Sequence, residues 1–409
     1  MSADPDGSER FRLGVNYWPA RTAMGWWTDF DEAELGTDFA RIAAVGFDSV
    51  RVFLTWEDFQ PGPKQVNTER LGRLVAVADL AGRAGLAVMP TLFTGHMSGV
   101  NWIPAWALGG SDGDDRFRVV SRARPTTAGL RNWYADAEVG AAQALLAREA
   151  ATALAGHDAV WAWDLGNENS NCVIPPSRAS ARDWLERVTA AIRAADPAVD
   201  ITIGLHMEDL QEDRRLGPAE AAGVCDFLTM HGYPIYARWA KGPTDEHLLP
   251  FLAQLTRWLG GDSDVLFSEF GLPTYRRADP DGERSRHESP SPLIEEEVAA
   301  AYTERALSGL RQAGCTGAML WCYTDYVPAT WANPPLDVAV HERSFGLWRA
   351  DGSPKPSVQV VEGFSGVDKL AGPDGYEWVD IEPEELWDSA GNLSRLYDRY
   401  RESSGSTSP

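Results

Sequence analysis

Short apolar runs alternate along this chain with longer segments in which apolar residues recur at helical spacing. This alternation predicts repeated βα units that build a parallel sheet covered by helices. Eight of the apolar runs have the length of a β-strand, and several carry a polar residue at or just after their C-terminal end. The predicted strands are residues 12–18, 49–56, 87–94, 160–166, 201–207, 227–231, 265–268 and 318–323.

Seven segments of helical period lie between these strands. Gly46, Gly85 and Gly314 stand where a helix should end before the next strand begins, a position that favours glycine. Eight strands with helices between them predict an α/β fold of the (β/α)8 TIM-barrel type. We expect one catalytic domain with a short C-terminal extension over residues 1–400, and a disordered tail over residues 401–409. The predicted helices are residues 31–45, 68–84, 135–154, 177–195, 218–223, 244–259 and 293–313.

Three connections that follow predicted strand ends are long: residues 95–132, 273–292 and 324–352. They are rich in Gly, Pro, Asp and Arg, as loops are. In a (β/α)8 barrel such loops rise from the C-terminal face, where the catalytic groups lie. We therefore expect three long loops around the mouth of the barrel.

The composition narrows the choice of partners. The 409 residues include 37 basic and 60 acidic side chains, a formal net charge of -23, whereas nucleic acids and anionic membranes require a basic face. Residues 1–12 lack the apolar core of an export signal, and no run of about 18 apolar residues occurs. The four cysteines lack CxxC spacing. We expect a cytoplasmic protein that binds neither nucleic acid nor membrane, and the sequence indicates no oligomeric state.

Two carboxylates stand at the C-terminal ends of two predicted strands. Glu168 closes the sequence WDLGNE, and Glu269 lies in the sequence LFSEFG. Parallel strands of an α/β barrel deliver their catalytic groups at this end. Paired carboxylates there indicate cleavage of a glycosidic bond, and a retaining mechanism would place them roughly 5 to 5.5 Å apart.

Polar or aromatic side chains end the other predicted strands as well. The C-terminal ends of barrel strands converge, so these side chains should lie close together whatever their separation in the sequence. In chain order the set is Asn16, Arg51, His96, Asn167 with Glu168, His206, His231 with Tyr233, Glu269, and Trp321.

Other roles are open to these residues. Glu168 alone could cap a helix, and Glu269 alone could be a structural ion-pair partner. The histidines of the set could bind a metal ion, but no HExxH or comparable spacing supports one, so we predict no metal site. Tryptophans in or beside the loops could stack on sugar rings. These are Trp18, Trp56, Trp102, Trp106, Trp239, Trp321 and Trp331.

The motifs together resemble glycoside hydrolase family 5, over roughly residues 12–348. The resemblance rests on Asn-Glu at the fourth strand, His-Gly-Tyr at the sixth, Ser-Glu-Phe-Gly at the seventh and Trp at the eighth. It implies a retaining (β/α)8 glycosidase with Glu168 as acid/base and Glu269 as nucleophile. One departure is Asn169, where many members have proline. The residues expected to bind substrate are Asn16, Arg51, His96, Asn167, His231, Tyr233 and Trp321.

The chemistry of such an enzyme requires one protonated and one ionised carboxyl group. We expect Arg51 and the Tyr233 hydroxyl to hold Glu269 ionised, and the nearby negative charge to raise the pKa of Glu168. Asn167 is suited to bind the 2-hydroxyl of the sugar.

Within the family, the opening sequence LGVNYWP and the three long loops resemble the intracellular β-mannosidase-like subfamily. The resemblance implies an exo-acting β-mannosidase that releases terminal β-mannose from small oligosaccharides by double displacement, with no cofactor. Alternatives within the family are an endo-β-1,4-mannanase and a β-glucosidase or glucanase. A non-catalytic sugar-binding barrel is the alternative from another class.

Overall fold

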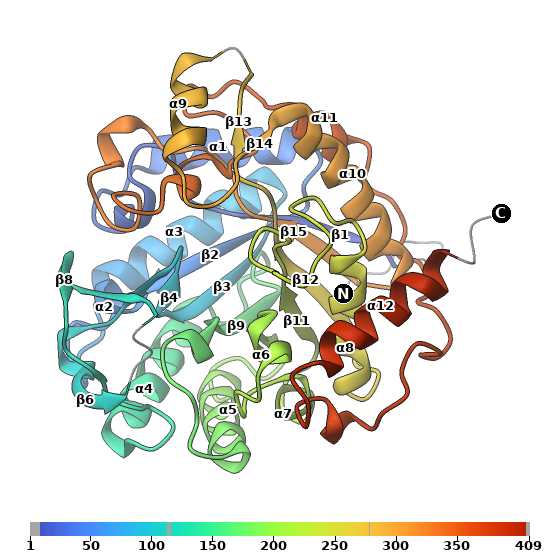
Figure 1. Ribbon diagram of the computed structural model, residues 1–409. Helices are drawn as coiled ribbons and strands as arrows, with labels where there is room; N and C mark the ends of the chain where they lie inside the picture. The colour runs from blue at the N-terminus through green and yellow to red at the C-terminus, as the bar shows by residue number, and fades with distance from the viewer. Residues whose placement is uncertain (1–8, 113–115, 278, 406–409) are drawn as a thin grey trace.

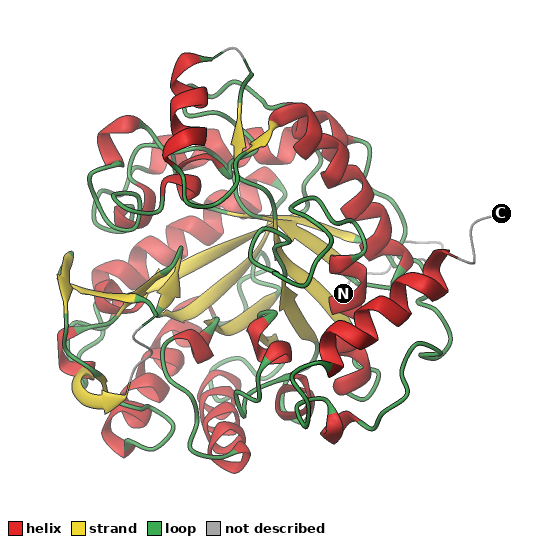
Figure 2. Ribbon diagram, in the orientation of Figure 1, coloured by secondary structure: helices red, strands yellow, loops and turns green. Residues whose placement is uncertain are grey.

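Eight parallel strands form the centre of the protein. The computed structural model describes residues 9–112, 116–277 and 279–405. The strands follow one another in the order β10-β9-β3-β2-β1-β15-β12-β11, and a parallel bridge between His206 and His231 joins the two outer strands. This closed arrangement confirms the predicted (β/α)8 barrel (Figure 2). The strands are β1 (Arg12–Asn16), β2 (Ser49–Thr55), β3 (Ala87–Thr94), β9 (Ala162–Asn167), β10 (Asp200–Gly204), β11 (Leu228–His231), β12 (Val265–Phe270) and β15 (Gly317–Leu320).

Helices surround the strands on the outside (Figure 1). Asp31, Asn67 and Asp136 begin three of them by accepting hydrogen bonds from backbone N–H groups of the first turn, as helix N-caps do. Helix α8 (Leu248–Leu259) begins later than the predicted residue 244. The reason is that the side chain of Asp245 accepts hydrogen bonds from the N–H groups of Lys241 and His247 in a turn before the helix. The helices between strands include α1 (Glu32–Ala44), α3 (Thr68–Ala84), α4 (Ala137–Leu154), α5 (Arg178–Arg193), α7 (Pro218–Ala222), α8 (Leu248–Leu259) and α10 (Glu296–Gln312).

The three long loops contain regular structure that the sequence did not reveal. The first carries a four-stranded sheet beside the barrel, in which β4 pairs with β5, β5 with β7 and β7 with β8 (Figure 1). The second contains the pair β13 (Thr274–Tyr275) and β14 (Ile294–Glu295) with α9 (Pro280–Glu288) between them, and the third contains the short helices η4 (Pro328–Thr330) and η5 (Val340–Ser344). The strands of the first loop are β4 (His96–Met97), β5 (Val100–Trp102), β6 (Leu108–Asp112), β7 (Arg118–Ser121) and β8 (Arg124–Thr126).

The C-terminal segment ends in α12 (Asn392–Gly405), which packs beside α8 on the outer surface (Figure 1). The rings of Phe251 on α8 and Tyr397 on α12 lie 5.0 Å apart, centroid to centroid. We expected a disordered tail from residue 401, but helix α12 continues through Gly405; residues 406–409 lie outside the described part. Among the described helices, none combines the length and apolar character needed to cross a membrane.

Candidate active site

Glu168 and Glu269 face each other across the C-terminal mouth of the barrel. Glu168 follows β9 directly and adopts the left-handed backbone conformation, with φ at 49°, whereas Glu269 is part of β12. Both line a cavity of about 440 Å³. A carboxylate oxygen of Glu168 and one of Glu269 lie within 4.8 Å of each other. This separation is slightly shorter than we expected, and far below the roughly 6.5 to 9.5 Å that an inverting mechanism requires.

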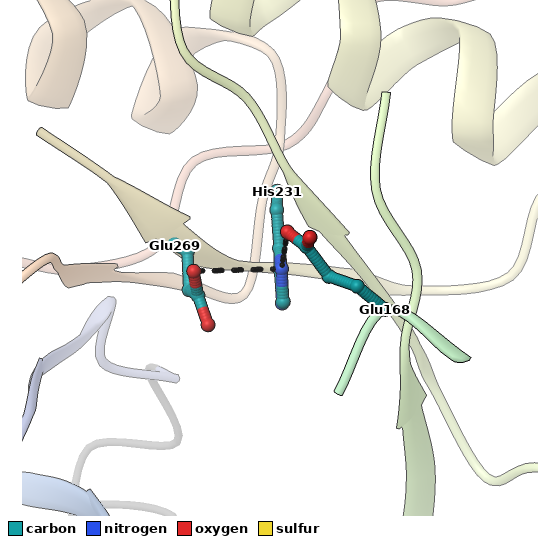
Figure 3. A group of neighbouring side chains, drawn as sticks. All are labelled: Glu168, His231 and Glu269. Atoms are coloured by element: carbon teal, nitrogen blue, oxygen red, sulfur yellow. Dashed lines mark hydrogen bonds and ion pairs between the residues drawn. The ribbon is translucent and has the colours of Figure 1, made fainter. Parts of the chain in front are cut away.

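Imidazole rings and an amide surround the carboxylate of Glu168. His231 Nδ1 lies 2.9 Å from Oε1, and Asn171 Nδ2 donates a hydrogen bond to Oε2 over 3.0 Å. His96 Nε2 and His206 Nδ1 approach Oε2 at 3.7 and 4.0 Å. Figure 3 shows the ring of His231 between the two carboxylates, with Nδ1 also 3.6 Å from Oε2 of Glu269.

The surroundings of Glu269 are different, because its two oxygens have separate strong donors. Arg51 donates from Nη1 to Oε1, and the hydroxyl of Tyr233 donates to Oε2 over 2.8 Å. Arg51 is fully buried and also binds Asp164 and Asn167 through Nη2, at 2.6 and 2.8 Å. The guanidinium is therefore a fixed positive charge beneath one oxygen of Glu269.

The two carboxyl groups therefore have different electrostatic surroundings. Burial raises the pKa of Glu168; His96 opposes this effect and Glu208 adds to it. Burial also raises the pKa of Glu269, opposed by His231 and Arg51. However, burial lowers the pKa of His231 to about 4, so its ring is uncharged at neutral pH.

Arg51 is a permanent positive charge in direct contact with the pair, since a guanidinium stays protonated. It contacts Glu269 and not Glu168. This contact favours the ionised form of Glu269 over that of Glu168. This is the division of roles that a retaining glycosidase needs.

Five of the seven residues predicted to bind substrate line the cavity: His96, Asn167, His231, Tyr233 and Trp321. Asn16 and Arg51 do not. Both are fully buried behind Glu269, where Asn16 Oδ1 accepts a hydrogen bond from Arg51 Nη1 over 3.1 Å. In the structure Arg51 holds Glu269 and Asn16 holds Arg51, and a direct contact of either residue with substrate stays a prediction.

Asn167 is well placed for the role expected of it. Its Oδ1 accepts a hydrogen bond from Arg51, and its Nδ2 donates to the backbone oxygen of His96 over 2.8 Å. The amide group has a second hydrogen on Nδ2 that is free to bind a sugar hydroxyl. The two existing hydrogen bonds fix the amide in the wall of the cavity.

Several cavity residues were missed in the sequence. Asn171 binds Glu168, and Phe117 packs on His96 with 4.4 Å between ring centroids. His341 and Glu342 reach the cavity from η5, where both contact the hydroxyl of Tyr236. Because all of these residues lie in loops or on short helices, no strand pattern marked them.

Most of the tryptophans predicted to stack on sugars do not line the catalytic cavity. Among them only Trp321 lines the catalytic cavity. Trp18 and Trp56 are completely buried, where Trp18 stacks on Phe53 and Trp56 packs against Trp106 and Trp133.

The three histidines of the alternative metal site gather around Glu168. Among the described residues, Glu168, His231 and Glu269 form a group whose possible ligand atoms all lie within 4.8 Å of one another. Arg51 already supplies a positive charge to Glu269, and a divalent cation there would be repelled by the adjacent guanidinium. The donor set therefore fits a hydrogen-bonded carboxylate pair better than a cation.

Solved structures with the same fold include glycoside hydrolases, whereas no protein-family model and no curated protein matches the chain. A GH5_18 protein from Streptomyces cattleya, solved with GlcNAc, has a TM-score of 0.79 and 22% sequence identity, over 98% of this chain and 92% of that protein. A variant of the same protein, solved with Manβ1-4GlcNAc, has a TM-score of 0.76, 22% identity and coverage of 97% and 92%.

An exo-β-1,4-mannosidase from Opitutaceae bacterium strain TAV5 has a TM-score of 0.70 and 28% sequence identity. The match covers 89% of this chain, which spans 60% of the length of that enzyme. These likenesses confirm the predicted fold. The GH5_18 proteins also agree with the resemblance of the sequence motifs to glycoside hydrolase family 5.

Proposed function

We propose that this protein is a retaining exo-β-glycosidase, a β-mannosidase that releases terminal β-mannose from small oligosaccharides. The proposal rests above all on one observation: two carboxylates within 4.8 Å of each other in one cavity, of which only Glu269 contacts a guanidinium. This spacing allows Glu269 to attack the sugar directly, without an intervening water.

In the first step, the carboxylate of Glu269 forms a bond to the anomeric carbon while Glu168 gives its proton to the glycosidic oxygen, which leaves as an alcohol. In the second step, Glu168 removes a proton from water, and the resulting hydroxide displaces Glu269. Two inversions at one carbon leave the product with the β configuration. Asn167 contributes a hydrogen bond to the 2-hydroxyl that strengthens in both transition states.

The preference for mannose is supported by the comparisons. One solved relative is an exo-β-1,4-mannosidase, and another was solved with a disaccharide that has a β-mannosyl group. Exo-action is supported by the walls of the catalytic cavity, which include residues of all three long loops, because a walled pocket admits the end of a chain more readily than its middle. The cytoplasmic location stays a prediction.

The test compares an aryl β-mannoside, an aryl β-glucoside, mannobiose, mannosyl-β-1,4-N-acetylglucosamine and polymeric mannan. Release of mannose from the small β-mannosides, with little action on the polymer, supports the proposal. Rapid internal cleavage of mannan or a clear preference for glucosides contradicts it. Glu269→Gln is the matched control, because it keeps the shape of the cavity and removes the nucleophile. Binding of sugar without turnover by the unmodified protein would favour a non-catalytic barrel.

A further inference from the structure

A chain of buried polar side chains leads away from the wall of the catalytic cavity. His206, which follows β10, lines the cavity. Ser170 lies in η3 (Asn169–Asn171), and Asp209 lies in α6 (Glu208–Gln211). All three side chains are buried, and none of them takes part in the two steps of glycoside cleavage.

Hydrogen bonds join the three side chains. Ser170 Oγ lies 2.8 Å from Nε2 of His206 and 2.5 Å from Oδ1 of Asp209. The other oxygen of Asp209 accepts a hydrogen bond from the backbone N–H of His206 over 3.1 Å. At the cavity end, Nδ1 of His206 faces Oε2 of Glu168 at 4.0 Å. The chain therefore links the surroundings of Glu168 to a second buried carboxyl group.

The hydrogens of this chain can be arranged in two directions. Burial lowers the pKa of His206 well below its usual value, so the ring is neutral and carries one hydrogen. When Asp209 is ionised, the Ser170 hydroxyl donates to it, and His206 then donates from Nε2 to Ser170. Nδ1 is left with a lone pair. When Asp209 is protonated, it donates to Ser170, the hydroxyl donates to Nε2, and Nδ1 carries the hydrogen of the ring.

The two directions have opposite effects on Glu168. A lone pair at 4.0 Å favours the protonated carboxyl group, whereas an N–H at the same place favours the carboxylate. The change from one direction to the other is balanced: one proton enters from the cavity at Nδ1, the hydrogen on Nε2 passes to Ser170, and the hydroxyl hydrogen passes to Asp209. Burial raises the pKa of Asp209 to about 7, so both directions are populated near neutral pH.

We propose that Asp209 controls the acid/base Glu168 without touching it. Through Ser170, it determines whether His206 presents a lone pair or an N–H to the catalytic carboxyl group. Asp209 is thus a positioning residue, and in its ionised form it keeps Glu168 protonated to a higher pH. This inference rests on the proposed function and adds a control of its acid/base.

Other charged groups surround the chain. Arg214 is buried and donates to the backbone oxygen of Ser170 over 3.0 Å. Its charge adds to the effect of burial in lowering the pKa of His206, and it opposes the effect of burial at Asp209. The substitutions that test the proposal leave these groups in place. Further titratable groups near the chain are His96, Arg116, Tyr134, Glu208, Glu212 and His231.

Asp209→Asn should fix the direction of the chain. The backbone N–H of His206 needs an acceptor, so the amide oxygen of the variant takes this place and the amide nitrogen donates to Ser170. The hydroxyl then donates to Nε2, and Nδ1 carries the hydrogen at every pH. The basic limb of the profile of kcat/KM against pH depends on protonated Glu168. It should therefore move to lower pH by about one unit.

A second comparison separates the chain from a direct effect of charge, because loss of a nearby negative charge would itself lower the pKa of Glu168. Ser170→Ala interrupts the chain and leaves Asp209 in place. Asp209→Asn should move the basic limb far less in the Ser170→Ala background than in the unmodified protein. Asp380→Asn is the matched control, since it removes a carboxylate from a pair with Arg395 near the C-terminal helix, and it should leave the limb in place.

The hydrogen on the His206 ring can be located without any substrate. In protein labelled with 15N-histidine, the chemical shifts of the ring nitrogens distinguish a nitrogen with a hydrogen from one without. His206→Gln identifies the signals of this residue among the seven histidines. At pH 8 the hydrogen should lie on Nε2 in the unmodified protein and on Nδ1 in Asp209→Asn.

Three results would overturn the inference. The first is a hydrogen on the same ring nitrogen in both proteins. The second is a basic limb that does not move in Asp209→Asn. The third is an equal movement with and without the Ser170 hydroxyl, which would show a direct effect of charge. If the unmodified protein hydrolyses no aryl β-glycoside, the proposed function itself fails. That failure is distinct, because the ring measurement needs no activity.

Discussion

The hydroxyl of Tyr233 donates a hydrogen bond to Oε2 of Glu269 over 2.8 Å. Arg51 holds the other oxygen of the same carboxylate, so Glu269 is fixed in position before any sugar arrives. Burial raises the pKa of Tyr233 well above its usual value, which keeps the hydroxyl protonated as a donor. A carboxylate held in this way loses little conformational freedom when it attacks, as nucleophilic catalysis requires.

Glu269 should form the covalent intermediate. A 2-deoxy-2-fluoro glycoside slows the breakdown of a glycosyl-enzyme, so incubation with it should add one sugar to Glu269. Peptide mass spectrometry locates the adduct. An adduct on Glu168, or none during measurable turnover, would show that the roles are reversed or that the mechanism is not retaining. Glu269→Gln should give no adduct and should lower kcat by roughly three orders of magnitude or more.

Glu168 should act as acid and then as base. Glu168→Ala should slow substrates with poor leaving groups far more than substrates with good ones, because only the former need a proton from the enzyme. The measurement is kcat/KM for a series of aryl β-glycosides whose phenols differ in pKa. Asn171→Ala is a useful control, since it removes the hydrogen bond to Glu168 and keeps the acid itself. Equal losses across the series in Glu168→Ala would contradict this role.

The position of the catalytic pair could be predicted because it depends on strand ends. The apolar run of β3 (Ala87–Thr94) has the same bounds in sequence and structure, and the runs before Glu168 and Glu269 end close to their predicted positions. Once the strands are parallel and closed into a barrel, their C-terminal ends must converge. Two carboxylates at such ends therefore meet, although 100 residues lie between them.

The direction of a side chain could not be predicted in the same way. All seven residues of β2 are buried, so no alternation of polar and apolar positions indicates whether Arg51 reaches the cavity. It lies behind Glu269 instead. Glu342 was missed for another reason: it reaches the cavity from η5 in the third long loop, and the path of a loop depends on tertiary contacts.

Arg51 should be essential to both stability and activity. It is fully buried and pairs with Asp164 and Glu269. Arg51→Met keeps most of the volume but leaves two buried carboxylates without their cation, and removal of one partner of a buried ion pair lowers the free energy of unfolding by roughly 3 to 5 kcal/mol. Urea unfolding measures this change. Arg395→Met, in an exposed pair, should change it far less. An equally stable Arg51→Met variant would contradict the central position of the guanidinium.

Asp209 should make stability fall as the pH rises. Burial raises the pKa of its carboxyl group from a usual 3.8 to about 7, although Ser170 Oγ and the N–H of His206 both donate to it. Between these values the folded protein keeps a proton that the unfolded chain has lost, so this group favours folding most at low pH and its contribution declines up to about pH 7.

Asp209→Asn removes this titration and keeps both hydrogen-bonding positions. The melting temperature of the variant, relative to the unmodified protein, should therefore increase from pH 5 to pH 8. Asp380→Asn serves as control, because Arg395 lowers the pKa of Asp380 and so keeps its titration below this range. A relative melting temperature that is constant or decreases for Asp209→Asn would contradict the raised pKa.

Tyr233→Phe should move the acidic limb of the pH profile. Activity requires ionised Glu269, and the Tyr233 hydroxyl stabilises that form and lowers its pKa. Loss of the hydroxyl should raise the pKa of Glu269, so that activity declines at a higher pH as the solution is acidified. The basic limb depends on the protonated form of Glu168, which Tyr233 does not contact, and should stay in place. Measurement of kcat/KM against pH separates the two limbs, because it reports groups of the free enzyme.

Tyr236→Phe is the matched control: Tyr236 lines the same cavity but binds Glu342 and His341, so neither limb should move. A shift of the acidic limb to lower pH in Tyr233→Phe, or a shift of the basic limb alone, would show that Glu269 is not the group that must be ionised.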